Sequence, residues 1–214
     1  PHSANASTAP LRETRQPQSD NRIGLIGLDR ASFQSTLSEL GEPAYRAKQI
    51  WHWLYYRGAR TFEEMTNLPK SLRTRLSDSC NISRPTITHT QQSEDGSHKW
   101  LVRFMDEREV ECVHIPEEDR GALCVSSQVG CTLTCRFCHT GTQKLVRNLD
   151  ASEIINQVLI ARDTIGEWPS PKGGRMISNI VMMGMGEPLY NFDNVARALR
   201  IIMDGEGISL SRRR

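Results

Sequence analysis

Strand-like and helix-like segments alternate in the second half of the chain, and this rhythm constrains the fold more than any other feature. Apolar runs predict strands at residues 122–126 and 177–183. Helical periods follow them at residues 151–165, which Asp150 is placed to cap, and at residues 192–203. Strands joined by helices form parallel sheets or barrels, whose reactive groups collect at the carboxyl ends of the strands. We therefore predict an α/β fold with a site beyond those ends.

Three cysteines, Cys131, Cys135 and Cys138, lie between the first of these strands and its helix, in the spacing C-x3-C-x2-C. Three thiolates can hold three irons of a [4Fe-4S] cluster and leave the fourth iron open to another ligand. Structural zinc is the alternative; it needs four ligands, of which Cys124 or Cys112 would be the last, and usually shows paired C-x2-C motifs. Only one such motif occurs here, which favours the iron-sulfur interpretation over zinc and over unligated thiols.

A second candidate element, Gly184-Met185-Gly186-Glu187-Pro188-Leu189, follows the strand at residues 177–183. Its glycines allow the backbone to approach a ligand closely, and its carboxylate can accept a hydrogen bond from an ammonium group. The same residues also suit an ordinary turn, since Gly and Pro punctuate many loops.

The first 80 residues divide into a polar leader and a helical unit. Residues 1–21 have almost no large apolar side chains, which predicts a disordered leader. Residues 22–80 have helical periods, and between residues 41 and 78 seven basic residues stand against four acidic ones. The predicted helical pieces are those around Phe33–Leu40, 47–55, Thr61–Asn67 and 69–77.

Four aromatic residues, Trp51, Trp53, Tyr55 and Tyr56, interleave with the basic residues of this unit. They fit an RNA-binding face, in which cations contact phosphates and rings stack on bases. On the residues alone the stronger interpretation is a helix that buries Trp51 and Tyr55 at i, i+4 and leaves its cations in water.

Residues 84–120 change to the period of an antiparallel meander. Strands are predicted at residues 87–92, 99–104 and 109–115, with turns at residues 94–96 and 105–107. The apolar runs are too short to span a membrane, and the first twenty residues lack the apolar region of a secretory leader. Six cysteines in such a chain indicate metal or redox chemistry in the cytosol rather than a disulfide framework.

The cysteine motif, with Phe137 before its last thiol, resembles the signature of the radical S-adenosylmethionine (SAM) superfamily, and the GEP element resembles that superfamily's SAM-contacting turn. Over about residues 28–214 the chain resembles more narrowly the RlmN/Cfr family of RNA methyltransferases. The residues that carry this resemblance are Glu111 to Pro116, Leu123 to Cys131, Arg147 to Leu149 and Met182 to Leu189.

The resemblance implies roles for individual residues. Cys131, Cys135 and Cys138 would bind the [4Fe-4S] cluster, and Gly186 with Glu187 would bind SAM. Glu111 matches the family's proton acceptor. Without the resemblance, a lone Glu on a predicted strand would be interpreted as a charged surface residue in contact with water. Cys124 matches the thiol that resolves a protein–RNA adduct through a transient disulfide; on its own it reads as a small buried residue.

The resemblance also implies a fold, a reaction, a cellular location and an electron donor. The fold would be an N-terminal helical RNA-binding domain, a small antiparallel β segment at residues 84–120 and, from residue 121, the first units of a (β/α)6 radical SAM barrel. The reaction would methylate C2 of adenosine in 23S rRNA and tRNA with two SAM molecules. The protein would be a cytoplasmic monomer that receives electrons from a donor such as flavodoxin or ferredoxin.

The chain departs from the family in one respect that bears on the chemistry. Family members carry a methylatable cysteine near the C-terminus, whereas no cysteine follows Cys138 here. Six barrel units need roughly 190 residues, and only about 90 follow Ala122. We therefore expect a C-terminally truncated fragment that cannot complete methyl transfer alone. No role is assigned to Cys80, Cys112 or His139.

Overall fold

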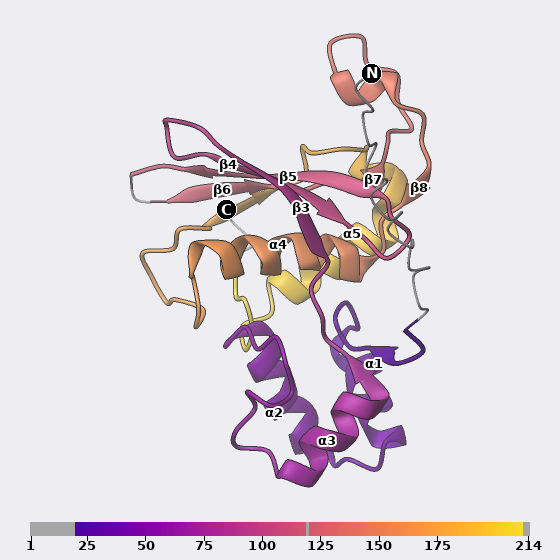
Figure 1. Ribbon diagram of the computed structural model, residues 1–214, viewed down its shortest axis with the longest axis vertical. Helices are drawn as coiled ribbons and strands as arrows, with labels where there is room; N and C mark the ends of the chain where they lie inside the picture. The colour runs from indigo at the N-terminus through magenta and orange to yellow at the C-terminus, as the bar shows by residue number, and fades with distance from the viewer. Residues whose placement is uncertain (1–19, 119, 212–214) are drawn as a thin grey trace, which may run out of the picture.

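The computed structural model describes residues 20–118 and 120–211, so the predicted leader at residues 1–21 lies almost entirely outside the described part. Its layers are a β-sheet, the long helix α4 and a helical unit, with α4 between the other two (Figure 1). None of the described helices is long and apolar enough to cross a membrane.

The helical unit contains α1 (Arg30–Glu39), α2 (Ala44–Tyr55) and α3 (Lys70–Ser79). A short parallel pair, β1 (Ile23–Gly24) and β2 (Cys80–Asn81), joins its two ends. Helix α1 begins after Asp29, whose side chain accepts a hydrogen bond from the Ser32 amide. The helices predicted around Phe33, at residues 47–55 and at residues 69–77 are thereby confirmed.

The predicted helix at Thr61–Asn67 is wrong, because these residues form turns. The Glu64 carboxylate does accept the Thr61 amide at 3.0 Å, as the capping-box register predicts. It also accepts the Arg60 amide at 3.1 Å, so that it closes a turn instead of starting a helix. Pro69 then caps α3, which begins at Lys70.

The aromatic residues of α2 divide between core and surface. Trp51 and Tyr55 are buried, with ring centroids 4.5 Å apart, and Phe33 meets the Trp51 ring edge-on at 5.3 Å. Trp53 lies at the surface beneath the Arg57 guanidinium, 4.7 Å from its ring centroid. The core interpretation is therefore confirmed for Trp51 and Tyr55, and any RNA contact from this helix falls to its other residues.

One five-stranded sheet contains both the predicted meander and the predicted parallel strands. Its order is β3-β4-β5-β6-β9, with every neighbouring pair antiparallel except β6 and β9, which are parallel. The strands are β3 (Thr86–Gln92), β4 (His98–Arg103), β5 (Glu109–Pro116), β6 (Gly121–Cys124) and β9 (Asn179–Val181). The sequence predicts each strand, but not that the two groups share a sheet.

Helix α4 (Ala151–Ile165) connects β6 to β9 and covers one face of the sheet. Asp150 and Glu153 form a complete capping box at its start, which confirms the predicted boundary. Helix α5 (Phe192–Ile202) packs beside α4 through buried residues such as Val195 and Ala198.

Successive side chains along each strand point to opposite faces of the sheet. Trp100, Val102, Val110, Cys112 and Leu123 are buried on the α4 side. Their neighbours on the same strands point to the opposite side, which we call the open face because its side chains stay partly exposed; Glu111 and Cys124 lie there.

The helical unit docks directly on α4 and its flanking loops. Gly27, at φ 88°, approaches α4 so closely that a Cβ would lie 2.5 Å from the Ser152 backbone nitrogen. The nearly buried Arg84 donates from Nε to the Asp163 carboxylate of α4 at 3.0 Å. The unit and the sheet therefore share α4 as a common support.

Candidate functional site

The cysteine loop, residues 130–146, is an excursion between β7 (Gln128–Val129) and β8 (Arg147–Asn148), which pair antiparallel. Gly130, at φ 75°, begins it against the Lys144 carbonyl, where a Cβ would be only 2.1 Å from the oxygen. Within the loop the Cys138 amide donates to the Cys135 carbonyl at 3.1 Å, and a short 3-10 helix, η1 (His139–Thr142), follows. The backbone thus holds Cys135 and Cys138 on one turn, while Cys131 lies at the start of the loop, where it bridges to Lys144.

The three thiols, of Cys131, Cys135 and Cys138, are free and partly exposed. Across the described ranges no three His, Cys, Asp or Glu side chains stand close enough together to hold a metal ion. The donor chemistry still suits an iron-sulfur cluster, because three thiols share one short loop and the Leu133 amide already points at the Cys131 sulfur, 3.4 Å away. Phe137, beside the last thiol, is 93% exposed.

The GEP loop, residues 184–189, lies beside the start of the cysteine loop, beyond the carboxyl ends of β6 and β9. Its Met185 carbonyl accepts the Ser127 and Gln128 amides at 2.8 and 3.2 Å, and the Met185 amide donates to the Ser126 hydroxyl at 2.9 Å. Gly186, at φ 95°, packs against Gln128 so tightly that a Cβ would lie 2.5 Å from the Gln128 Cβ. The two predicted elements therefore meet where the parallel-strand pattern places them.

We call the place where the cysteine loop and the GEP loop meet the junction. The Gln128 side chain is hydrogen-bonded there to the cysteine loop, the GEP loop and β8, and the sequence did not mark it as a candidate. Its fully buried side chain accepts the Glu187 amide at 3.1 Å and the Thr132 amide at 3.2 Å. Its amide nitrogen donates to Asn148 Oδ1 at 2.7 Å and to the Thr132 hydroxyl at 2.9 Å. A polar residue next to the buried end of a strand was the available signal, since such a side chain must find partners.

Arg147, at the end of the cysteine loop, is held between two carboxylates. It pairs with Glu153 of the α4 capping box and with Asp106 of the β4–β5 turn, each at 2.7 Å. The hydrogen bond from Arg147 keeps the pKa of Asp106 below its usual value. The loop's return strand is thereby fixed to both the helix and the meander.

Glu111 and Cys124 lie on the open face, on adjacent strands of the sheet. Glu111 is linked to the junction through its backbone, because its carbonyl accepts the Ser126 hydroxyl at 2.7 Å. Burial raises the pKa of the Cys124 thiol, and the nearby negative charge of Glu111 raises it further. The Glu111 carboxylate itself pairs with the Lys99 ammonium at 2.5 Å.

The unassigned residues stand apart from this group. Cys80 is buried in the helical unit, and Cys112 is buried on the α4 side of the sheet, where its sulfur lies 3.9 Å from the Gln157 carbonyl. Cys112 therefore lies on the opposite face of the sheet from Cys124, buried against α4, whereas the three loop thiols are partly exposed. His139 is exposed at the start of η1.

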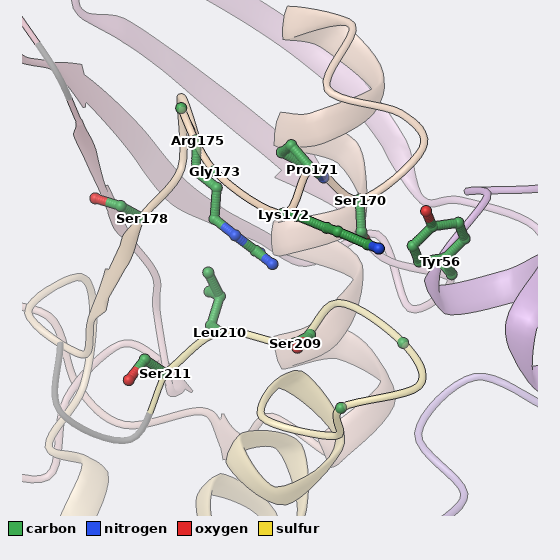
Figure 2. Close-up of a pocket in the computed structure, with 13 residues that line it drawn as sticks. Tyr56, Ser170, Pro171, Lys172, Gly173, Arg175, Ser178, Ser209, Leu210 and Ser211 are labelled. Atoms are coloured by element: carbon green, nitrogen blue, oxygen red, sulfur yellow. The ribbon is translucent and has the colours of Figure 1, made fainter.

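A cavity of about 660 Å³ lies at the opposite, amino end of β9, between the loops at residues 170–175 and 205–211 (Figure 2). Lys172 and Arg175 extend across it from the first loop. Tyr56 lines it, but none of the residues predicted to bind the cluster or SAM or to act in catalysis does, so the candidate site is where the cysteine loop and the GEP loop meet and not this cavity.

Comparisons with known proteins agree with this geometry. Residues 23–82 match the family model described as the ribosomal RNA large subunit methyltransferase N-terminal domain. A dual-specificity RNA methyltransferase RlmN from Rhodospirillum rubrum is 57% identical over 212 residues, which are 97% of this chain and 50% of that protein. A second RlmN, from Granulibacter bethesdensis, is 57% identical over 199 residues, which are 91% of this chain and 50% of that protein.

Among solved structures, the crystal structure of a radical SAM methyltransferase from Sphaerobacter thermophilus superposes with a TM-score of 0.81 at 40% identity. The match covers 90% of this chain and 55% of that one. The chain thus spans about half the length of the curated relatives it matches.

Proposed function

Because the chain belongs to the RlmN family and spans about half the length of its relatives, we propose that it is part of a radical SAM RNA methyltransferase. The substrate would be C2 of adenosine in 23S rRNA and tRNA, in the cytosol. The observation that carries the proposal is the meeting of the cysteine loop and the GEP loop beyond β6 and β9, with the buried Gln128 bonded to both.

The residues present fit the groups that this chemistry needs. Cys131, Cys135 and Cys138 would hold a [4Fe-4S] cluster, and Gly186 with Glu187 would bind SAM beside it. When bound, the cluster and SAM would supply the radical that activates a methyl group. Electrons would come from a donor such as flavodoxin or ferredoxin.

The open face would supply the polar steps of the reaction. Glu111, which pairs with Lys99, would accept a proton from the substrate. The Cys124 thiol would attack the sulfur of the methyl-carrying cysteine of the longer relatives, so that a transient disulfide forms as the sulfur–carbon bond to the RNA breaks; all six cysteines of this chain are free in the structure. The helical unit would help to hold folded RNA with the exposed residues of its basic surface.

The 214-residue chain alone would not complete methyl transfer, because no cysteine follows Cys138 to carry the methyl group. Incubating the purified chain with SAM, a reductant and RNA should therefore give no methyladenosine by mass spectrometry. Detection of 2-methyladenosine would contradict this part of the proposal.

Anaerobic reconstitution with iron and sulfide tests the cluster separately. We expect about four irons per chain and an electron paramagnetic resonance signal that SAM perturbs. Cys135→Ser should lose the cluster, and Cys124→Ser, a matched change of a partly exposed thiol outside the loop, should keep it. One tightly held zinc that Cys124→Ser releases would instead support a zinc-stapled RNA-binding module.

A further inference from the structure

The open face brings Lys99 into the neighbourhood of both residues with proposed polar roles. Strand pairing places Lys99 opposite Val113, Val113 opposite Cys124, and Cys124 opposite Val181, in one row across four strands. Glu111 lies two residues from Val113 on β5 and therefore on the same face, one position along. Lys99 is thus the diagonal neighbour of Glu111, within the reach of a long side chain.

The contact between them is direct. The Lys99 Nζ lies 2.5 Å from Glu111 Oε1, with the two side chains 43% and 45% exposed. In the part of the chain that the structure describes, this is the only ion pair of Glu111. On the five described strands of the sheet, the charged or titratable side chains on this face, besides Cys124, are His89, Lys99, Arg103, Glu109 and Glu111.

In the proposed chemistry, the Lys99 ammonium can offset the negative charge of its neighbours. Glu111 accepts a proton in its carboxylate form, and Cys124 reacts in its thiolate form, so the charge of each group affects how readily the other becomes negative on this face. A carboxylate alone disfavours a neighbouring thiolate, whereas a carboxylate paired with an ammonium is nearly neutral at a distance. Arg103, the other cation of β4, already pairs with Glu107 and Glu109.

We propose that Lys99 is a positioning residue for this pair: its ammonium holds the Glu111 carboxylate on the open face and offsets its charge beside the Cys124 thiol. The roles of Glu111 and Cys124 in this inference rest on the proposed function, but the effect of Lys99 on the thiol does not require the cluster, SAM or RNA.

The test measures how fast Cys124 is alkylated by iodoacetamide in the 214-residue chain, resolved by peptide mass spectrometry. Rates are taken between about pH 7.5 and 9.5, where histidine is neutral and lysine still charged. Lys99→Met should slow the reaction at pH 8 about two- to fivefold, the range expected for a partly exposed ion pair. Lys99→Arg should restore the rate, and Glu111→Gln should raise it.

A double-mutant cycle decides whether Lys99 acts through Glu111. In the Glu111→Gln background, Lys99→Met should change the rate much less than in the wild type. Arg103→Met is the matched control: it removes a cation from the same strand and face, about 13 Å further along, and should leave the rate unchanged. Circular dichroism checks that each variant is folded.

Equal effects of Lys99→Met in both backgrounds, or no effect in either, would overturn the inference. Because methylation is not measured, a failure here is distinct from a failure of the proposed function. Conversely, loss of the cluster in the reconstitution experiment would leave the alkylation result standing.

Discussion

Replacing Gly186 by alanine tests how closely the GEP loop must fit the start of the cysteine loop. Gly186 has φ 95°, a conformation that costs an L-residue about 1–2 kcal/mol. The new Cβ would also lie 2.5 Å from Gln128 Cβ and 2.7 Å from the Gln128 backbone nitrogen, so that no rotamer change relieves the overlap. Overpacking of this kind costs about 1–3 kcal/mol, which gives a total of about 2–5 kcal/mol.

Gly41→Ala is the matched control, because Gly41 has φ 81° and nothing within 4 Å of its Cβ position. It should lose only the conformational part, about 1–2 kcal/mol. Urea unfolding followed by circular dichroism measures both free energies of unfolding, and their difference isolates the overlap. If Gly186→Ala is no more destabilising than Gly41→Ala, the close packing between the two loops is refuted.

Three other outcomes follow from the contacts described above. Gln128→Met should lower the free energy of unfolding by about 2–3 kcal/mol, measured in urea, because its hydrogen bonds to the GEP loop and to β8 are lost. Because Arg147 lowers the pKa of Asp106, their pairing stabilises the fold above pH ~4, and this stabilisation is lost as the pH falls through the lowered pKa. Asp106→Asn should therefore have a lower melting temperature than the wild type at pH 6. The melting temperatures of the two proteins should converge at low pH. Arg84→Met should cost about 3 kcal/mol in urea unfolding, because it leaves the largely buried Asp163 carboxylate without its closest cation; a loss below 1 kcal/mol would show that Arg84 contributes little.

Local patterns in the sequence predicted the individual elements well where neighbouring residues decide the structure. The start of α4 is an example, because Asp150 and Glu153 satisfy each other within four residues. Thr61 and Glu64 carry the same signal, yet these residues form a turn in which the Glu64 carboxylate accepts the amides of both Thr61 and Arg60. A local motif therefore predicts a hydrogen bond more reliably than it predicts the helix after it.

The arrangement of the site depends on pairings between distant strands, which no local pattern contains. Cys124 and Glu111 share a face only because β6 pairs with β5 in the register that places Val113 opposite Cys124. A shift of one residue would turn Cys124 toward α4. Lys99 and Gln128 were missed for the same reason, since their partners come from other strands and loops.

The mixed sheet also has a consequence for the order in which the protein is made. Its strands pair in their order along the chain, from β3 to β9, so each strand emerging from the ribosome finds its partner already synthesised. The meander pairs with one side of β6 and β9 with the other, and among the described residues β9 has no strand on its far side. A further parallel strand in a longer relative would extend this sheet at β9, next to the loops that carry the cysteines and the GEP element.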